Sequence, residues 1–431
     1  MITTGPSLFS PASLRSLKKL LLHNSSITLK LKIYSLIPPL VQEKDTALLQ
    51  LFFTPNKRTC HIALKSNQIT ILSLLDFSKA FDTVNHTKFL SLLPHFNFSN
   101  SAIHLFQSYL SDRKQFIQHQ TKKSSTLHIS SGVPQGSILG PIIFNMYVAS
   151  LNNTITNLGF KAINYVDDFQ LALSGPITQI KQLVSKTNQA LDEIQTASTH
   201  LDLVLNFTKS NFLVIAKKNH HKLPEIKALN HIGNINRLTH QKNLGVIFDD
   251  QLTFNEHHIK TLKSCYAILH ILKHLRHKLS SDNKKIIITS LIFSKLNYAN
   301  LITHPLTSHW SNKYNRLYRT CLSFIFARHI HTYQMHQQGF LSIKNMYLSQ
   351  LLNLTYKSLY LPEFPNYLKV KLQAQSRFSL RSDDHIQLET PFDDHKHPFQ
   401  FTTSNQFNNL PPHIRDIQGI QQFNTFKQKD G

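Results

Sequence analysis

Two groups of carboxylates in this chain could hold metal ions and act on phosphate. Asp76 follows a short apolar run, ITILSLL (69–75), and the pair Asp167-Asp168 interrupts the apolar stretch FKAINYVDDFQLAL (160–173). Adjacent carboxylates repel one another, and a divalent cation such as Mg²⁺, which binds carboxylate and phosphate oxygens, offsets that repulsion best. With a third carboxylate, the pair could hold two ions that stabilise the attacking and leaving oxygens of a displacement at phosphorus. An Asp-Asp pair is also common in structural turns, so the dipeptide alone leaves both interpretations open.

Strands are expected on both sides of these carboxylates. The β-branched run at 69–75 predicts a buried strand that ends at Asp76. In 160–173, apolar residues alternate with smaller or polar ones, which predicts a β-hairpin with Asp167 and Asp168 at its tip. Further strands are predicted at 212–215 and 244–248.

Helices are predicted before and after the hairpin. Residues 86–118 are expected to be helical, with a turn at Ser111-Asp112. Ser174-Gly175-Pro176 then opens another helix. The apolar residues of that helix mark one face of a 3.6-residue period: Ile177, Ile180, Leu183, Val184, Leu191 and Ile194.

The charge of the chain indicates a polyanionic partner. Among 431 residues, 47 are Lys or Arg and 23 are Asp or Glu, which gives a net charge of +24. A field of this sign attracts nucleic acids, with an anionic membrane surface as the competing partner. No stretch approaches the length of an apolar membrane span, so no membrane insertion is expected. The three isolated cysteines favour a reducing compartment over a disulfide framework or a Cys-based zinc site.

From about residue 255 the sequence becomes helical and basic. In 257–278 one stripe is apolar: Ile259, Leu262, Tyr266, Leu269 and Leu272. The other face is basic: Lys260, Lys263, Lys273, Arg276 and Lys278. This pattern suits nucleic-acid binding, but a solvated amphipathic helix would look the same. After about 365 the chain turns polar and Pro-containing, which predicts a separate small module or a loose tail. The first 42 residues, Ser-rich and free of acids, read as a poorly ordered or truncated start, or as an organelle transit segment.

Three long motifs carry a family resemblance. LSLLDFSKAFDTVNH (72–86), SGVPQGSILGPIIFN (131–145) and YVDD (165–168) resemble, in order and spacing, the first three palm motifs of LINE-type (non-LTR) reverse transcriptases. LNFTKSNFLVI (205–215) is similar to the fourth motif, and NLGVIFDDQLTF (243–254) to the fifth, the primer-gripping segment. SRFSLRSDDHIQLETP (376–391) and FNNLPPHIRD (407–416) are similar to C-terminal segments of some of these elements, although a tryptophan is usual where Phe407 stands.

The resemblance implies an α+β, right-hand polymerase fold with incomplete fingers, an antiparallel-sheet palm and a mainly helical thumb. The expected divisions are an N-terminal segment (1–44), reverse transcriptase fingers and palm (45–254), a basic helical thumb (255–365) and a C-terminal tail module (366–431).

It also implies roles for single residues. Asp76, Asp167 and Asp168 would hold two Mg²⁺ ions, for which Mn²⁺ could substitute. Lys209 would donate a proton to the leaving pyrophosphate, or is simply one more exposed lysine. Phe81 matches an aromatic gate that excludes ribonucleotides, or is an ordinary core residue.

The remaining matched positions surround the nucleotide and the primer. Phe77, Tyr165 and the turn Pro134-Gln135-Gly136 would line the nucleotide site, with the turn letting backbone approach the template base. Asn243, Leu244 and Gly245 would start the primer-gripping hairpin.

The implied activity is RNA-directed DNA synthesis on an RNA template and a DNA primer from deoxynucleoside triphosphates, in the nucleus or cytoplasm; the sequence does not set the oligomeric state. No segment resembles the endonuclease domain that generally precedes the polymerase, and a basic RPI-type stretch of the fingers is missing, so the chain is expected to be a fragment or a decaying copy of an element. Three alternatives remain: an inactive nucleic-acid-binding remnant, a maturase-type splicing helper, and an RNA-directed RNA polymerase, which Phe81 disfavours.

Overall fold

The computed structural model describes residues 2–4, 55–134, 136–137, 139–165, 167–327, 335, 338–361, 364, 369–372, 386–391 and 398–417. The chain divides into two compact units, Met1–Leu238 and Thr239–Gly431. The predicted divisions at residues 44, 254 and 365 separate parts named by function, such as palm and thumb. They stay predictions.

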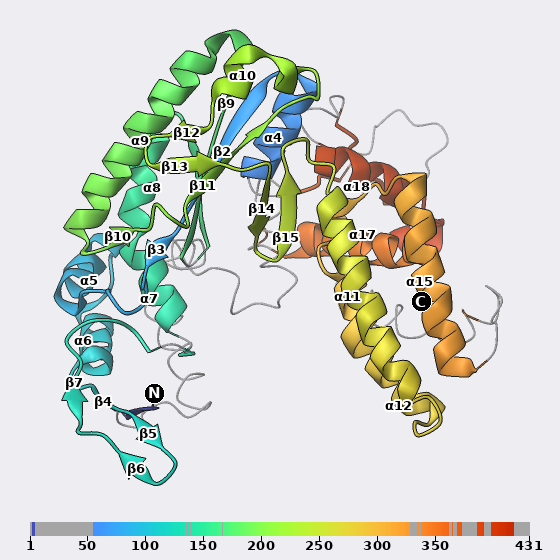
Figure 1. Ribbon diagram of the computed structural model, residues 1–431, viewed down its shortest axis with the longest axis horizontal. Helices are drawn as coiled ribbons and strands as arrows, with labels where there is room; N and C mark the ends of the chain where they lie inside the picture. Colours follow the sequence, from blue (N-terminus) through green and yellow to red (C-terminus); the bar gives the residue numbers. More distant parts are fainter. Residues whose placement is uncertain are drawn as a thin grey trace. The chain divides into compact units, whose positions relative to one another are not determined.

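A six-stranded sheet is the centre of the first unit (Figure 1). Its strands, in spatial order, are β12 (His231–Ile232), β13 (Ile235–Arg237), β11 (Asn211–Ile215), β2 (Ile69–Leu75), β9 (Asp168–Gly175) and β8 (Lys161–Tyr165). All neighbouring pairs are antiparallel except β11 and β13. The predicted strand at 69–75, the hairpin at 160–173 and the strand at 212–215 are confirmed.

Helices cover both faces of this sheet. The main helices of the unit are α4 (Pro55–Lys65), α5 (His86–Leu92), α6 (Asn100–Leu110), α7 (Gly140–Tyr147), α8 (Ala149–Thr156) and α9 (Ile180–His200). Short turns of helix lie at η2 (Leu93–Phe96), η3 (Ile177–Gln179), η4 (His220–Lys222) and α10 (Pro224–Ala228). Figure 1 shows α8 and α9 on one side of the sheet and α4 on the other.

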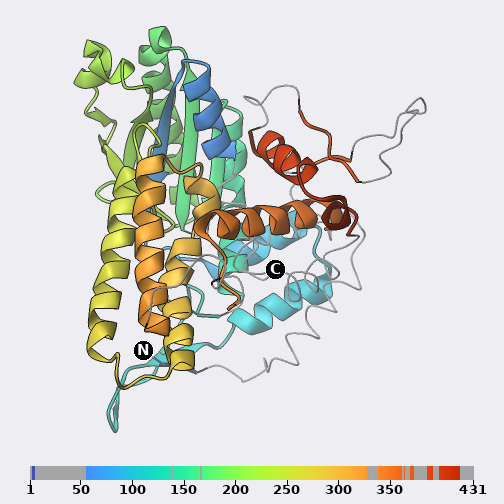
Figure 2. The ribbon, with the colours of Figure 1, turned by 90° about the vertical axis from the view of Figure 1, so that its right-hand side faces the viewer.

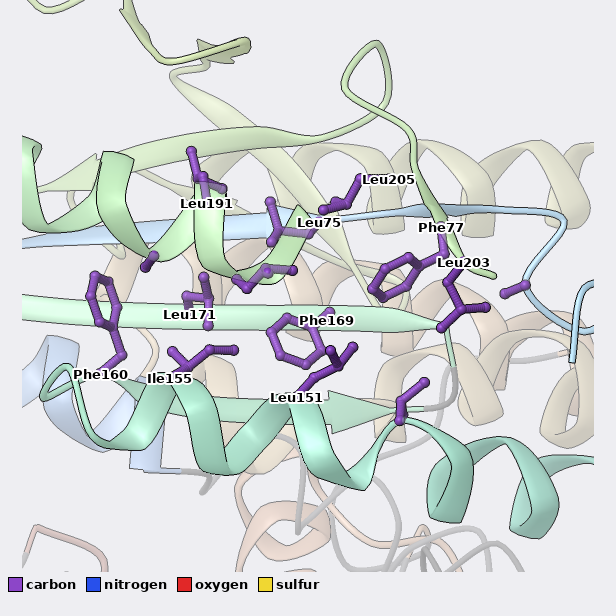
Figure 3. Close-up of a cluster of buried hydrophobic side chains, with 14 of the residues drawn as sticks. Leu75, Phe77, Leu151, Ile155, Phe160, Phe169, Leu171, Leu191, Leu203 and Leu205 are labelled. Carbon is purple, nitrogen blue, oxygen red and sulfur yellow. The ribbon is translucent and has the colours of Figure 1, made fainter. Parts of the chain in front are cut away.

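The main core of the unit lies between the sheet and helices α8 and α9 (Figure 3). Phe169 and Leu171 of β9 pack there against Leu151 and Ile155 of α8. Because side chains alternate along a strand, the even-numbered residues of β9 point to the opposite face. The predicted apolar face is confirmed along α9, although Ile177 lies in η3 just before it, and four of the six residues are buried: Ile180, Leu183, Leu191 and Ile194.

One helix prediction was too long. Helix α6 ends at Leu110, and after the predicted turn the chain forms strand β4 (Lys114–Phe116) instead of more helix. Ser111 is already extended (ψ 154°) and ends the helix, and Asp112 then takes a left-handed backbone conformation (φ 52°) in the turn. Strand β4 pairs with β1 (Ile2–Thr4) and with β7 (Leu127–His128), and a second small ribbon follows from β5 (Gln118–His119) and β6 (Lys122–Lys123). Strands β3 (Phe77–Ser78) and β10 (Val204–Leu205) make a further short pair.

The second unit begins with a hairpin of β14 (His240–Asn243) and β15 (Val246–Asp249). Leu244 and Gly245, at φ 47° and 85°, form its two-residue turn. The strand predicted at 244–248 therefore starts two residues later, and Asn243, Leu244 and Gly245 lie at the tip of the hairpin and not at its start. The Tyr298 hydroxyl donates a hydrogen bond to the Leu244 carbonyl at this tip.

Helices make up most of the rest of the second unit. They are α11 (Asn255–His274), α12 (Ser281–Ile288), η5 (Thr289–Phe293), α13 (Ser294–Asn297), α14 (Asn300–Thr303), α15 (Ser308–Phe326), α17 (Ile343–Tyr360), α18 (Pro398–Asn408) and α19 (Pro412–Arg415). Figure 2 shows α11 and α15 running side by side, and they share one core. The stripe predicted on α11 is wrong at one position, because Tyr266 is 39% exposed and Cys265 is buried in its place.

The described residues of the C-terminal tail form a small core on α17. Phe407 is fully buried and meets the Tyr356 ring edge-on at 5.9 Å. Asn408 binds the Leu388 backbone twice, accepting from its N–H at 2.8 Å and donating to its carbonyl at 2.9 Å. Within the ranges given above, no helix combines the length and apolar character that crossing a bilayer requires.

Candidate active site

Strand register brings two of the predicted carboxylates to one level of the sheet. Leu75 pairs with Phe169, so the next pair in this register is Asp76 with Asp168. On the other side of β2, Leu74 pairs with Asn211, and Lys209 stands in the turn just before β11. Asp76 and Asp168 lie on the sheet face opposite the α8–α9 core, because the core-facing residues of β2 and β9 are the odd-numbered ones.

The loop before β11 holds Asp76 in place. The Asp76 backbone N–H donates to the Ser210 hydroxyl at 3.0 Å, and the Asp76 carbonyl accepts from the Asn206 N–H at 2.8 Å. The Lys209 ammonium lies 3.9 Å from the Asp76 carboxylate and is itself well exposed. The fourth motif is therefore joined to the first at this strand end, by contacts to both the backbone and the side chain of Asp76.

The site is short of positive charge. Burial, followed by the charges of Asp167 and Asp76, raises the pKa of Asp168 to about 6. Burial also raises the pKa of Asp76; the Lys209 charge opposes this shift, and the Asp167 charge adds to it. All three carboxylates thus act on one another, and a bound cation would relieve their repulsion.

These residues fit a magnesium site by their chemistry. Oxygen ligands from one or more carboxylates are what Mg²⁺ prefers in proteins. Among the residues that the structure describes, no three His, Cys, Asp or Glu side chains already converge as a ligand set. Carboxylates with raised pKa values and a lysine as their nearest cation are nevertheless a suitable donor set for a divalent ion.

The turn before α7 packs on the loop after Asp76. The N–H groups of Gly132 and Val133 donate to the carbonyls of Val84 (2.7 Å) and Phe81 (2.8 Å). Gly132 has a φ of 85°, and a Cβ there would lie 2.8 Å from the Asp82 carbonyl oxygen, so only glycine fits. The Phe81 ring is half-buried and stacks on the fully buried Phe144 of α7 at 5.3 Å.

The other predicted nucleotide-site residues differ in placement. Phe77 is 4% exposed and meets Phe169 edge-on at 6.3 Å, so its ring packs in the core and only its backbone could approach a nucleotide. Pro134 is half-buried, and Gly136 is exposed with open space where a side chain would stand. Gln135 lies outside the described residues, and the side chain of Tyr165 does too, although its backbone pairs with Asp168.

Several residues that hold the site together were not singled out from the sequence. The His86 ring Nε2 lies 2.7 Å from the Gly132 carbonyl oxygen, and Asn206 and Ser210 anchor Asp76. The signal for these three was at hand, because each stands inside a recognised motif.

A further set ties the end of α9 to the same loop. Asn85 and Lys88 donate to the Asp202 carboxylate at 3.0 and 2.8 Å. The Tyr147 hydroxyl donates to the Leu201 carbonyl at 2.6 Å. Nothing in the local sequence indicated these long-range contacts.

The comparisons with known proteins agree with the geometry. The family model described as "Reverse transcriptase (RNA-dependent DNA polymerase)" matches residues 27–290, more than half of the chain. The chain belongs to the reverse transcriptase family.

Similar reverse transcriptases come from mobile elements of flies. The RNA-directed DNA polymerase from mobile element jockey of Drosophila funebris is 29% identical over 251 residues, which cover 55% of this chain and 26% of that protein. The probable RNA-directed DNA polymerase from transposon X-element of Drosophila melanogaster is 27% identical over 240 residues, covering 52% and 25%. The matched part of the chain thus spans about a quarter of the length of these curated relatives.

Among solved structures, the telomerase of Candida albicans, in complex with a fragment of telomeric RNA, aligns with a TM-score of 0.39. The alignment has 12% sequence identity and covers 80% of this reverse transcriptase chain and 56% of the telomerase chain.

Proposed function

We propose that this chain is an RNA-directed DNA polymerase of a non-LTR retrotransposon, which extends a primer 3′-hydroxyl on an RNA template. The observation that carries the proposal is the register that sets Asp76 beside Asp168, with Asp167 at the adjoining hairpin tip and the Lys209 ammonium 3.9 Å from the Asp76 carboxylate. The family and its mobile-element relatives support the choice of template and product.

Asp76 and Asp167 would hold two Mg²⁺ ions, with Asp168 as the supporting carboxylate. When bound, the ions lower the pKa of the primer hydroxyl and neutralise the triphosphate. Lys209, paired with Asp76 at 3.9 Å, would be released toward the nucleotide once Asp76 has another cation partner. Its ammonium could then donate a proton to the leaving pyrophosphate, which is the role predicted for it.

Phe81 would act as the gate against ribonucleotides. Its ring is fixed by stacking on Phe144, and its carbonyl is held by the Val133 N–H. A residue held both at one face of its ring and at its backbone cannot move aside easily for a 2′-hydroxyl. The backbone at Gly136, open and free of a side chain, would let the nucleotide or the template base come close.

The finer architecture follows from the same proposal. The six-stranded sheet with its helices would be the palm with incomplete fingers, and the α11–α15 helices the thumb. The β14–β15 hairpin would grip the primer with the tip that Tyr298 holds.

Primer extension on a generic RNA template with Mg²⁺ and deoxynucleotides tests the proposal. Asp167→Asn keeps the size of the side chain and removes its charge, so extension should be lost. Asp192→Asn, at an exposed position of α9, is the matched control and should extend like the wild type.

Extension that survives Asp167→Asn would contradict the metal role of the hairpin. A well-folded wild type that binds nucleic acid but does not extend the primer would refute the proposed activity and identify an inactive binding remnant.

A further inference from the structure

A β-ribbon stands out from the first unit between α6 and α7. We name residues 113–128 the basic ribbon; it contains β4, β5, β6 and β7. Every residue from 117 to 128 is exposed. Figure 1 shows β5 and β6 extending beyond α6, away from the six-stranded sheet. Nothing in the proposed chemistry uses this segment.

The charge of the ribbon has one sign. Between Asp112 and Asp167 the chain contains no Asp or Glu. Cross-strand pairing sets basic side chains opposite each other, with Lys114 facing His128 and His119 facing Lys122. A Lys and a His carry like charges only when the His is protonated, and like charges directly opposite destabilise a strand pair. A polyanion would remove that penalty.

The ribbon presents its lysines on a fixed frame. The Ile117 N–H donates to the Ser124 hydroxyl, and the Ser124 N–H donates to the Ile117 carbonyl, both at 2.8 Å. Lys123 lies over the Phe116 ring at 5.2 Å, so a cation stands at one face of this ring. No acidic side chain in the described part of the chain forms an ion pair with Lys114, Lys122 or Lys123.

We propose that the basic ribbon binds the phosphate backbone of the RNA strand, independently of its sequence and away from the carboxylate site. The choice of RNA rests on the proposed function; the choice of a phosphate backbone rests on the single sign of charge and on the exposure of the ribbon. A groove contact is not expected, because side chains cannot read the deep, narrow major groove of an A-form helix.

The test is binding of a labelled single-stranded oligouridylate to the full chain across a potassium chloride series. The variant K114Q/K122Q/K123Q removes three exposed lysines of the ribbon. Each lost phosphate contact on a single strand makes the negative slope of log affinity against log salt shallower by about 0.7. The loss of three lysines should therefore make the slope shallower by about 2. At about 0.1 M salt this should raise the Kd about tenfold or more.

The matched control is K181Q/K186Q/K218Q, which removes the same charge from exposed positions outside the ribbon. Its slope and Kd should change much less. Equal losses in both variants would overturn the proposal, because they would reflect net charge alone. It would also be overturned if the ribbon variant lost binding to phosphatidylserine vesicles and kept its RNA affinity.

Primer extension in parallel separates this inference from the proposed function. At saturating template-primer, the ribbon variant should extend with the wild-type kcat. Its KM for template-primer should be raised. If the ribbon variant matches the control variant in kcat, KM and RNA affinity, the proposed role of the ribbon is refuted and the polymerase proposal is unaffected. If the ribbon variant loses RNA affinity and the wild type does not extend the primer, RNA binding by the ribbon is supported and the proposed polymerase activity is refuted.

Discussion

Replacing Gly132 by alanine tests whether the turn before α7 is fitted to the loop that follows Asp76. A Cβ at Gly132 would lie 2.8 Å from the Asp82 carbonyl oxygen and 2.9 Å from the Asp82 Cα. Both contacts are with backbone, so no side chain can move aside to relieve them. The variant must shift one of the two segments.

The cost has three parts. An L-residue at a φ of 85° costs about 1–2 kcal/mol. Overpacking against the Asp82 backbone adds about 1–3 kcal/mol. Moving the turn also weakens the hydrogen bonds of Gly132 with Val84 and His86, each worth about 1 kcal/mol. We expect Gly132→Ala to destabilise the first unit by about 3–5 kcal/mol in total.

Comparison with Gly159→Ala isolates the steric part of the cost of Gly132→Ala. Gly159 has the same φ of 85°, but nothing lies within 4 Å of the place where its Cβ would be. It should cost only the backbone term, about 1–2 kcal/mol. Urea unfolding followed by circular dichroism gives both values. Fluorescence of Trp310, the one tryptophan of the chain, reports on the second unit and should not change in either variant.

Equal destabilisation by the two substitutions would refute the reasoning, because it would mean that the Gly132 turn does not pack closely on the Asp82 backbone. Unchanged primer extension by a folded Gly132→Ala variant would show that the loop and turn are not jointly needed to place the nucleotide.

Three further predictions follow from the site and the second unit. Phe81→Ala should relax discrimination against ribonucleotides, measured as the ratio of kcat/KM values for the two nucleotide types; an unchanged ratio would remove the gate role. Asp168, with a pKa raised from 3.8 to about 6, is harder to ionise in the folded state, so its ionisation lowers stability by about 1–2 kcal/mol once solvent screening of this partly exposed group is allowed for, with no penalty below pH 3.8 and the full penalty above pH 6. Asp168→Asn should accordingly stabilise the metal-free first unit above pH 6 but not below pH 3.8 in urea unfolding, and the same gain at both ends would contradict the assigned cause. Asp249→Ala should destabilise the second unit by about 2–4 kcal/mol in Trp310 fluorescence, because the buried carboxylate accepts from the N–H groups of Gln251, Thr253 and Phe254 and from the Thr253 hydroxyl; a loss under 1 kcal/mol would show that water replaces these bonds.

Local patterns predicted the strands that carry the carboxylates. Strand β2 has the predicted bounds, because its β-branched run is buried along its whole length. Strand β4 was missed because its partner β1 is far away in the sequence, with Ile2 opposite Phe116. The strand predicted at 244–248 wrongly included the turn at Leu244-Gly245, because apolar residues surround that turn. The glycine is a signal for a left-handed turn.

The Asp-Asp pairs show why the dipeptide alone could not identify the site. Such pairs occur at 167–168, 249–250, 383–384 and 393–394. The carboxylate of Asp249 is surrounded by donors and fixes the start of α11. Asp168 instead faces two other carboxylates, and burial adds to their effect. Only the motif context separated these environments in advance, and the contacts of Asn206 and Ser210 with Asp76 needed the folded chain.

The register that sets Asp76 beside Asp168 makes the site sensitive to insertions as well as to substitutions. One extra codon within β2 would shift the end of the strand by one position. The Asp76 side chain would then turn toward the core, and the Leu75 side chain would take its place beside Asp168. One extra codon at the exposed β5–β6 turn would change no buried pair. Two in-frame insertions of equal size would therefore have opposite consequences: the first would remove the site without altering any of its residues, and the second would leave the site unchanged.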